Sequence, residues 1–195
     1  MRSRKRTLII IAIVLCAILI SVIANIIISL VQKETYPKKY EEYVEKYASL
    51  YNVPEYIIYA VIKTESDFVA DTKSGEGALG LMQMMPKTFD YLTSDEHLDE
   101  ELEFESLSDP NVAIRYGVYY LRYLFNRFHK WNVVFAAYSK GETIVAEWLA
   151  DPKYSEDGEE LDKIPTRETR NYVKKVNNAI NYYKNTYYRN GVSVK

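Results

Sequence analysis

The sequence predicts a helical protein, in which one apolar helix precedes a domain of amphipathic helices. Residues 8–31 contain no charge over 24 positions, and a helix of that length spans the hydrocarbon layer of a bilayer. Further along, apolar side chains recur at spacings of three and four, which is the period of a helix with one buried face. Prolines also stand where such helices would begin.

The apolar run is predicted to be an uncleaved membrane anchor. Four basic residues and no acidic one precede it, so the positive-inside rule places residues 1–7 in the cytoplasm and everything after residue 31 outside. A cleaved signal peptide is the alternative, with Val22-Ile23-Ala24 as a weak cleavage site. The anchor is favoured because the apolar run resumes after Asn25 and becomes longer than a signal core needs. The expected location is the cell membrane, with a single span.

The remainder of the chain has the length of one ordinary domain. We expect a juxtamembrane connector at residues 32–39, the functional domain at residues 40–188 and a short tail at residues 189–195. All 27 acidic residues but only 21 of the 25 basic ones follow the anchor, so the formal charge of this part is 21 − 27 = −6. A charge of this sign argues against nucleic acid as a partner.

The residue types that bind metals are sparse. The two histidines, His97 and His129, lie far apart and in no metal-ligand spacing, and no phosphate-binding loop occurs. The single cysteine, Cys16, lies inside the apolar run and can form no intramolecular disulfide. Neither a metal nor an organic cofactor is therefore expected.

Several helices of the domain carry start signals. Pro54, Pro86 and the Asp109-Pro110 pair stand at expected helix beginnings, and Thr166 is an expected N-cap.

A stripe of tyrosines is expected on the first helix of the domain. Tyr40, Tyr43, Tyr47 and Tyr51 recur at spacings of three and four. Tyrosines also stack against sugars in carbohydrate-binding proteins, but a stripe at helical spacing is more often part of a core. The core interpretation is favoured.

Residues 65–88 have the features of an active site. Glu65 falls near the end of an apolar helix, where the exposed carbonyl groups disfavour a carboxylate. Three glycines follow and permit sharp turns, while leucines and methionines supply apolar atoms that are expected to exclude water near the carboxyl group. Desolvation and the helix end both act to raise the pKa of Glu65, as a general acid at neutral pH requires.

This segment resembles the lytic transglycosylase domain of the soluble type, a goose-lysozyme-like family that cleaves peptidoglycan. The resemblance lies in Glu65-Ser66, Ser74, the run from Gly77 to Gln83, Met85-Pro86 and Thr88. Later motifs follow in the same order. They are Asp109-Pro110, Ala136-Ala137-Tyr138-Ser139-Lys140-Gly141 and Pro165-Thr166-Arg167-Glu168-Thr169-Arg170-Asn171-Tyr172-Val173. The chain departs from the family pattern at Ala113 and Ser139, where asparagine is common.

The resemblance implies an all-α, lysozyme-like domain with a substrate groove between helices. It implies that Glu65 acts first as acid and then as base, and that the muramic acid C6 hydroxyl forms a 1,6-anhydro end without water. The residues implied to bind the sugars are Ser74, Gln83, Met84, Tyr138 and Glu168. For Glu168, a first-turn acid favoured by the helix dipole is an equally good interpretation.

Two other functions stay open from the sequence. A hydrolase of the lysozyme type needs a second carboxylate that holds a water molecule, and Asp67, Asp71 or Glu76 would have to supply it. A membrane-anchored glycan-binding scaffold without turnover is the other alternative. Only the departures at Ala113 and Ser139 favour the scaffold, whereas the presence of Glu65 counts against it.

Overall fold

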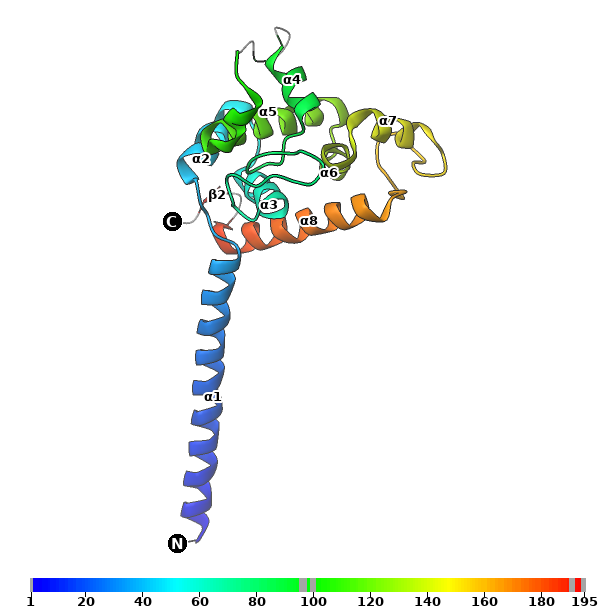
Figure 1. Cartoon of the computed structure of the whole chain (residues 1–195). Helices are drawn as coiled ribbons and strands as arrows, with labels where there is room; N and C mark the ends of the chain where they lie inside the picture. Colours follow the sequence, from blue (N-terminus) through cyan, green and yellow to red (C-terminus); the bar gives the residue numbers. More distant parts are fainter. Residues whose placement is uncertain (1, 95–97, 99–100, 190–191, 194–195) are drawn as a thin grey trace. The chain divides into compact units, whose positions relative to one another are not determined.

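The computed structural model describes residues 2–94, 98, 101–189 and 192–193, and the chain divides into two compact units, Met1–Pro37 and Lys38–Lys195 (Figure 1). The first unit is one helix, α1 (Arg2–Thr35). Its part Ile9–Thr35 is long and apolar enough to cross a membrane, a test that a signal sequence also passes. The apolar side chains described along it are exposed.

The second unit is built from helices and ends in a short hairpin. The elements are α2 (Glu41–Tyr51), α3 (Glu55–Glu65), α4 (Pro86–Thr93), the 3-10 helix η1 (Phe104–Ser108), α5 (Pro110–Phe128), α6 (Trp131–Lys140), α7 (Glu142–Ala150), α8 (Arg167–Tyr187), β1 (Tyr188–Arg189) and β2 (Val192–Ser193). The two strands pair antiparallel, with Tyr188 opposite Ser193. The strands include Arg189, Val192 and Ser193 of the segment expected to be a tail; residues 190–191 and 194–195 of that segment lie outside the described part, as does His97.

Helix α3 is the centre of the domain. Its residues from Ile57 to Ile62 are all buried, and both α2 and α8 pack against it. A helix buried on every face reads as a continuous apolar run rather than as a stripe. Glu65 is the last residue of this helix, so the rigid core fixes where its side chain starts.

The helix starts read from the sequence are confirmed. Pro54 is the N-cap residue of α3, and Pro86 occupies the first turn of α4. The Asp109 side chain accepts a hydrogen bond from the backbone nitrogen of Asn111 at 2.7 Å, and Thr166 accepts one from the backbone nitrogen of Thr169 at 3.4 Å. Local capping chemistry therefore sets the boundaries of the helices that border the cleft described below.

Two tyrosines of the stripe, Tyr47 and Tyr51, pack against α5, as a core interpretation requires. Tyr47 is 3 % exposed, and its hydroxyl donates to Oδ1 of Asn111 at 2.7 Å. The Tyr51 ring meets that of Tyr119 edge to face, with 5.4 Å between centroids. The other tyrosines of the stripe are half-buried.

The segment between α3 and α4 has no regular structure but is held tightly. The buried Ser66 hydroxyl donates to the carbonyl oxygen of Leu81 at 2.8 Å. Met82 packs so closely on Gly117 of α5 that a Cβ at that glycine would clash with its side chain. Gly80 has φ +85°, and a Cβ there would clash with the Leu107 carbonyl oxygen. Two glycines thus allow this segment to lie directly on α5 and η1.

Candidate active site

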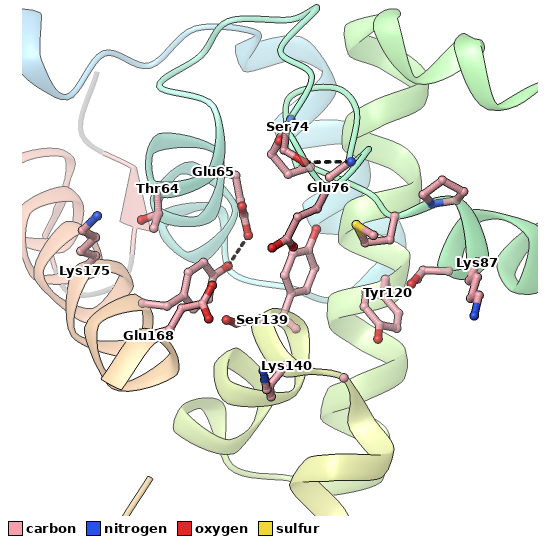
Figure 2. A pocket seen from close by; sticks show the side chains of 18 of the residues that line it. Thr64, Glu65, Ser74, Glu76, Lys87, Tyr120, Ser139, Lys140, Glu168 and Lys175 are labelled. Atoms are coloured by element: carbon pink, nitrogen blue, oxygen red, sulfur yellow. Dashed lines mark hydrogen bonds between the residues drawn. The ribbon is translucent and has the colours of Figure 1, made fainter. Parts of the chain in front are cut away.

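A cleft of about 980 Å³ opens beside the end of α3 (Figure 2). Its walls come from five parts of the chain that are far apart in sequence. These are the last turn of α3, the segment 74–88, α5 through Tyr120, the end of α6, and the first turns of α8. The cleft is therefore assembled only when the whole domain folds.

Glu65 is the acid at the centre of this cleft. The Tyr172 hydroxyl donates a hydrogen bond of 2.6 Å to its Oε1 atom, which Figure 2 marks with a dashed line. Burial raises the pKa of Glu65 from 4.5 to about 7, and the hydrogen bond from Tyr172 acts in the opposite direction. At neutral pH a substantial fraction of the group therefore keeps its proton, which is the condition for a general acid that must later act as a base.

Tyr172, which contacts Glu65, was named from the sequence only as part of the motif at residues 165–173 and was given no role of its own. It lies on α8, three residues after the buried Thr169 and four before the buried Val176. This spacing puts Tyr172 on the inward face of the helix. The spacing and the motif that contains Tyr172 were the signals available in the sequence. Burial and the nearby Glu65 raise the pKa of Tyr172, so its hydroxyl keeps the proton that it donates.

Tyr138 lines the cleft from α6, as expected. Its hydroxyl donates to the carbonyl oxygen of Met82 at 2.8 Å, and its ring lies 5.4 Å from that of Tyr120. Burial, followed by the charge of Glu65, raises the pKa of Tyr138. The side chain therefore lies within the electrostatic reach of Glu65 and ties the cleft segment to α6.

Ser74 and Gln83 line the cleft and also hold the shape of its wall. Ser74 Oγ accepts a hydrogen bond from the backbone nitrogen of Ala78 at 2.9 Å. The Gln83 side-chain nitrogen donates to the carbonyl oxygens of Thr72 and Gly80 at 2.8 and 2.9 Å. Gln83 itself has φ +47°, a conformation that costs energy in a residue other than glycine. Its two hydrogen bonds offset that cost.

The two remaining expected site residues differ in their position. Glu168 lines the cleft from the first turn of α8. Met84 is 3 % exposed and packs in the core, whereas Met85 lines the cleft and is 40 % exposed. The chain is extended here, and successive side chains of an extended chain point to opposite sides. This alternation turns Met85, rather than Met84, toward the cleft.

The other acidic residues considered from the sequence differ in whether they line the cleft. The Asp67 side chain is 70 % exposed and pairs with Lys63, and Asp71 is exposed and lies outside the cleft lining. Glu76 does line the cleft, with an exposed side chain. Among the described residues, no three histidine, cysteine, aspartate or glutamate side chains come together as metal ligands would.

A helical domain that holds one desolvated acid in an open cleft is arranged as an acid–base catalyst. Residues 42–161 match the family described as the transglycosylase SLT domain, and the chain belongs to this family. Its fold is accordingly all-α and lysozyme-like, with a long apolar helix at the N-terminus.

Individual relatives agree with the family. The chain is 33 % identical over 135 residues to the soluble lytic murein transglycosylase of Escherichia coli K12. It superposes with a TM-score of 0.70 and 29 % identity on the 70-kDa soluble lytic transglycosylase from Escherichia coli, over 79 % of this chain. An inactive Glu→Gln mutant of the lytic transglycosylase Slt from Pseudomonas aeruginosa gives a TM-score of 0.67 with 27 % identity, over 82 % of this chain.

These relatives are much longer proteins. The matched region is 68 % of this chain but 21 % of the murein transglycosylase from Escherichia coli K12. For the two solved structures the covered shares are 25 % and 26 %. The similarity therefore concerns only part of each relative.

The raised pKa of Glu65 predicts a pH-dependent effect of Glu65→Gln on stability. Folding favours the protonated carboxyl group. The contribution of Glu65 to the free energy of unfolding is therefore fully present below pH 4.5 and is lost as the pH rises through about 7. The glutamine variant, which never ionises, should gain about 3 kcal/mol in free energy of unfolding relative to the parent between pH 4 and pH 8. Urea unfolding of the full chain in detergent at both pH values measures this gain.

The control for this measurement is Glu76→Gln, because that exposed cleft carboxylate stays in water when the chain folds. It should show no comparable gain with pH. Equal pH dependence of the parent and the Glu65→Gln protein would mean that folding does not disfavour the ionised carboxylate.

Proposed function

We propose that this protein is a lytic transglycosylase that cleaves the β-1,4 bond between N-acetylmuramic acid and N-acetylglucosamine in peptidoglycan. The observation that carries the proposal is Glu65, a desolvated acid with a pKa of about 7 in an open cleft. Membership of the SLT family supports it, as do the relatives described above, which are lytic transglycosylases.

In the first step, Glu65 acts as general acid. Its proton passes to the glycosidic oxygen, the bond from that oxygen to C1 of the muramic acid breaks, and N-acetylglucosamine leaves with a free hydroxyl group. Positive charge develops at C1, where the N-acetyl group of the same sugar helps to stabilise it. Protonation of the leaving group is the part that a carboxylic acid with a near-neutral pKa does well.

In the second step, the ionised Glu65 acts as general base. It removes the proton of the C6 hydroxyl while the C6 oxygen bonds to C1, which closes a 1,6-anhydro ring. Glu65 recovers its proton, and no water is consumed. One carboxyl group therefore suffices, since the substrate supplies its own nucleophile.

The neighbours of Glu65 fit the two states of this cycle. The Tyr172 hydroxyl accepts or donates as the carboxyl group changes, and its donated hydrogen bond stabilises the ionised form. Ser74, Gln83, Tyr138 and Glu168 line the same cleft and would orient the sugar and its N-acetyl group. Tyr172 thus limits how far burial raises the pKa, so that Glu65 can both give up and regain the proton.

A hydrolase on the same fold is the second candidate, and Glu76 is the observation that favours it. This acid lies in the cleft lining with an exposed side chain, where it could hold an attacking water molecule. Hydrolysis would leave a reducing end on the muramic acid instead of an anhydro ring.

Product analysis tests the proposed reaction. Mass spectrometry of the fragments that the full chain releases from purified peptidoglycan should show anhydromuropeptides. Glu65→Gln should release them at least about 100-fold more slowly, because general acid–base catalysis contributes that much or more. Glu76→Gln should still release anhydro products. Reducing-end products that disappear with Glu76→Gln would instead establish the hydrolase. Glycan binding without any release would leave only the scaffold.

The proposal extends to the location of the protein. Helix α1 is an uncleaved anchor with residues 1–7 in the cytoplasm, and Lys38–Lys195 faces the cell wall. The charge arrangement around the apolar run supports this orientation, and the substrate lies on that side of the membrane.

The anchor predicts an intact mass for the protein extracted from membranes. The detergent-solubilised chain should begin at residue 1 or 2. Without protease, the chain should stay in the membrane fraction of spheroplasts. Protease added outside the spheroplasts should digest the domain. A mature protein that begins shortly after Ala24, found in the soluble fraction, would identify a signal peptide instead.

A further inference from the structure

Near Tyr120, three of the elements that line the cleft continue past their lining residues. Lys87 and Thr88 of α4 line the cleft, and so do Tyr120 of α5 and Gly141 at the end of α6. In Figure 2, Lys87 and Tyr120 lie at one end of the cleft and Lys175 at the other. The residues that follow on each wall show what a long ligand would meet at the first of these ends.

On each of these elements, a polar or aromatic side chain follows the residue that lines the cleft. Tyr91 comes three residues after Thr88 on α4, and Tyr123 comes three residues after Tyr120 on α5, so each lies on the same helix face as a cleft residue. Glu142, the first residue of α7, directly follows Gly141.

These three side chains meet one another. The Tyr91 and Tyr123 hydroxyl groups are 3.1 Å apart and their rings meet edge to face, with 5.8 Å between centroids. The Tyr123 hydroxyl also donates to Oε1 of Glu142 at 3.4 Å. Arg127 forms an ion pair with the same carboxylate. We call Tyr91, Tyr123 and Glu142 the tyrosine shelf.

The shelf is joined to the catalytic centre by a chain of rings. Tyr138, which lies beside Glu65, contacts Tyr120 with 5.4 Å between centroids, and Tyr120 stacks on Tyr123 at 6.2 Å. Tyr91, at the outer end, is 41 % exposed. Tyr47 and Tyr51 of α2 differ, because they pack against α5 and do not line the cleft.

We propose that the tyrosine shelf is an additional sugar-binding subsite, which takes a pyranose ring of the glycan strand beyond the sugars held in the cleft. An exposed tyrosine ring offers an apolar face for the C–H side of a sugar. The hydroxyl groups of Tyr91 and Tyr123 and the Glu142 carboxylate supply hydrogen-bonding groups for the sugar hydroxyls. Binding here makes affinity depend on strand length. This inference rests on the proposed function, because it takes the cleft ligand to be a glycan strand.

The test compares long and short glycans on an enzyme that does not cut them. Peptide-free glycan strands prepared from peptidoglycan are sorted into long strands and short oligosaccharides, and their binding to the full chain carrying Glu65→Gln is measured in detergent. This Glu65→Gln chain, the parent in the comparison, should bind long strands more tightly than short oligosaccharides. Adding Tyr91→Ala should weaken binding of long strands roughly 3- to 10-fold, as expected for one aromatic contact, and should leave short oligosaccharides unaffected.

Two variants separate the subsite from a general disturbance of the fold. Tyr91→Trp keeps an aromatic face and should retain the preference for long strands. Tyr182→Ala removes a half-buried tyrosine whose ring contacts Tyr183 and Tyr187 on α8, and it should change neither affinity.

The subsite is refuted if Tyr91→Ala binds long strands as tightly as the parent, or if it weakens long and short ligands equally. Its failure is distinguishable from failure of the proposed function. Release of anhydro products by the chain that carries Glu65 shows the reaction whether or not strand length affects binding. A Glu65→Gln chain that binds long and short glycans equally weakly refutes the subsite, while the release assay still decides the proposed function.

Discussion

The site depends on the removal of water from one carboxyl group. Glu65 ends a helix whose preceding residues lie in the core, and burial raises its pKa to about 7 against the opposing hydrogen bond from Tyr172. The two effects have different origins, since burial comes from the packing of the whole domain and the hydrogen bond from a single hydroxyl group. Their balance keeps the carboxyl group able both to give and to accept a proton near neutral pH.

The remaining structure keeps that environment in place. The irregular segment after α3 is tied down by the hydrogen bond from Ser66 to Leu81 and by the close packing of Met82 on Gly117. Tyr138 then joins the same segment to α6 through the Met82 carbonyl oxygen. A cleft wall without regular structure is thus held by Ser66, directly after α3, by its packing on Gly117 of α5 and by Tyr138 of α6.

Much of this could be predicted from the sequence because it depends on local signals. Proline and threonine mark helix starts, and an apolar run marks the helix that ends at Glu65. Each of these features depends on a few neighbouring residues. The contact between Tyr172 and Glu65 could not be predicted in this way, because it joins residues 107 positions apart. Met84 and Met85 show a second limit, since two adjacent methionines differ only in which side of an extended chain they occupy. The tyrosine shelf likewise depends on where α4, α5 and α7 meet.

The measurement that tests this account most directly is the titration of Glu65 itself. Carbon-13 NMR of carboxyl-labelled full-length chain in detergent, with Glu65→Gln to assign the resonance, gives the midpoint. The account predicts a midpoint near pH 7 and a still higher one in Tyr172→Phe, because that variant loses the hydrogen bond that lowers the pKa. A midpoint near 4.5, or a lower one after the loss of the Tyr172 hydroxyl, would contradict it.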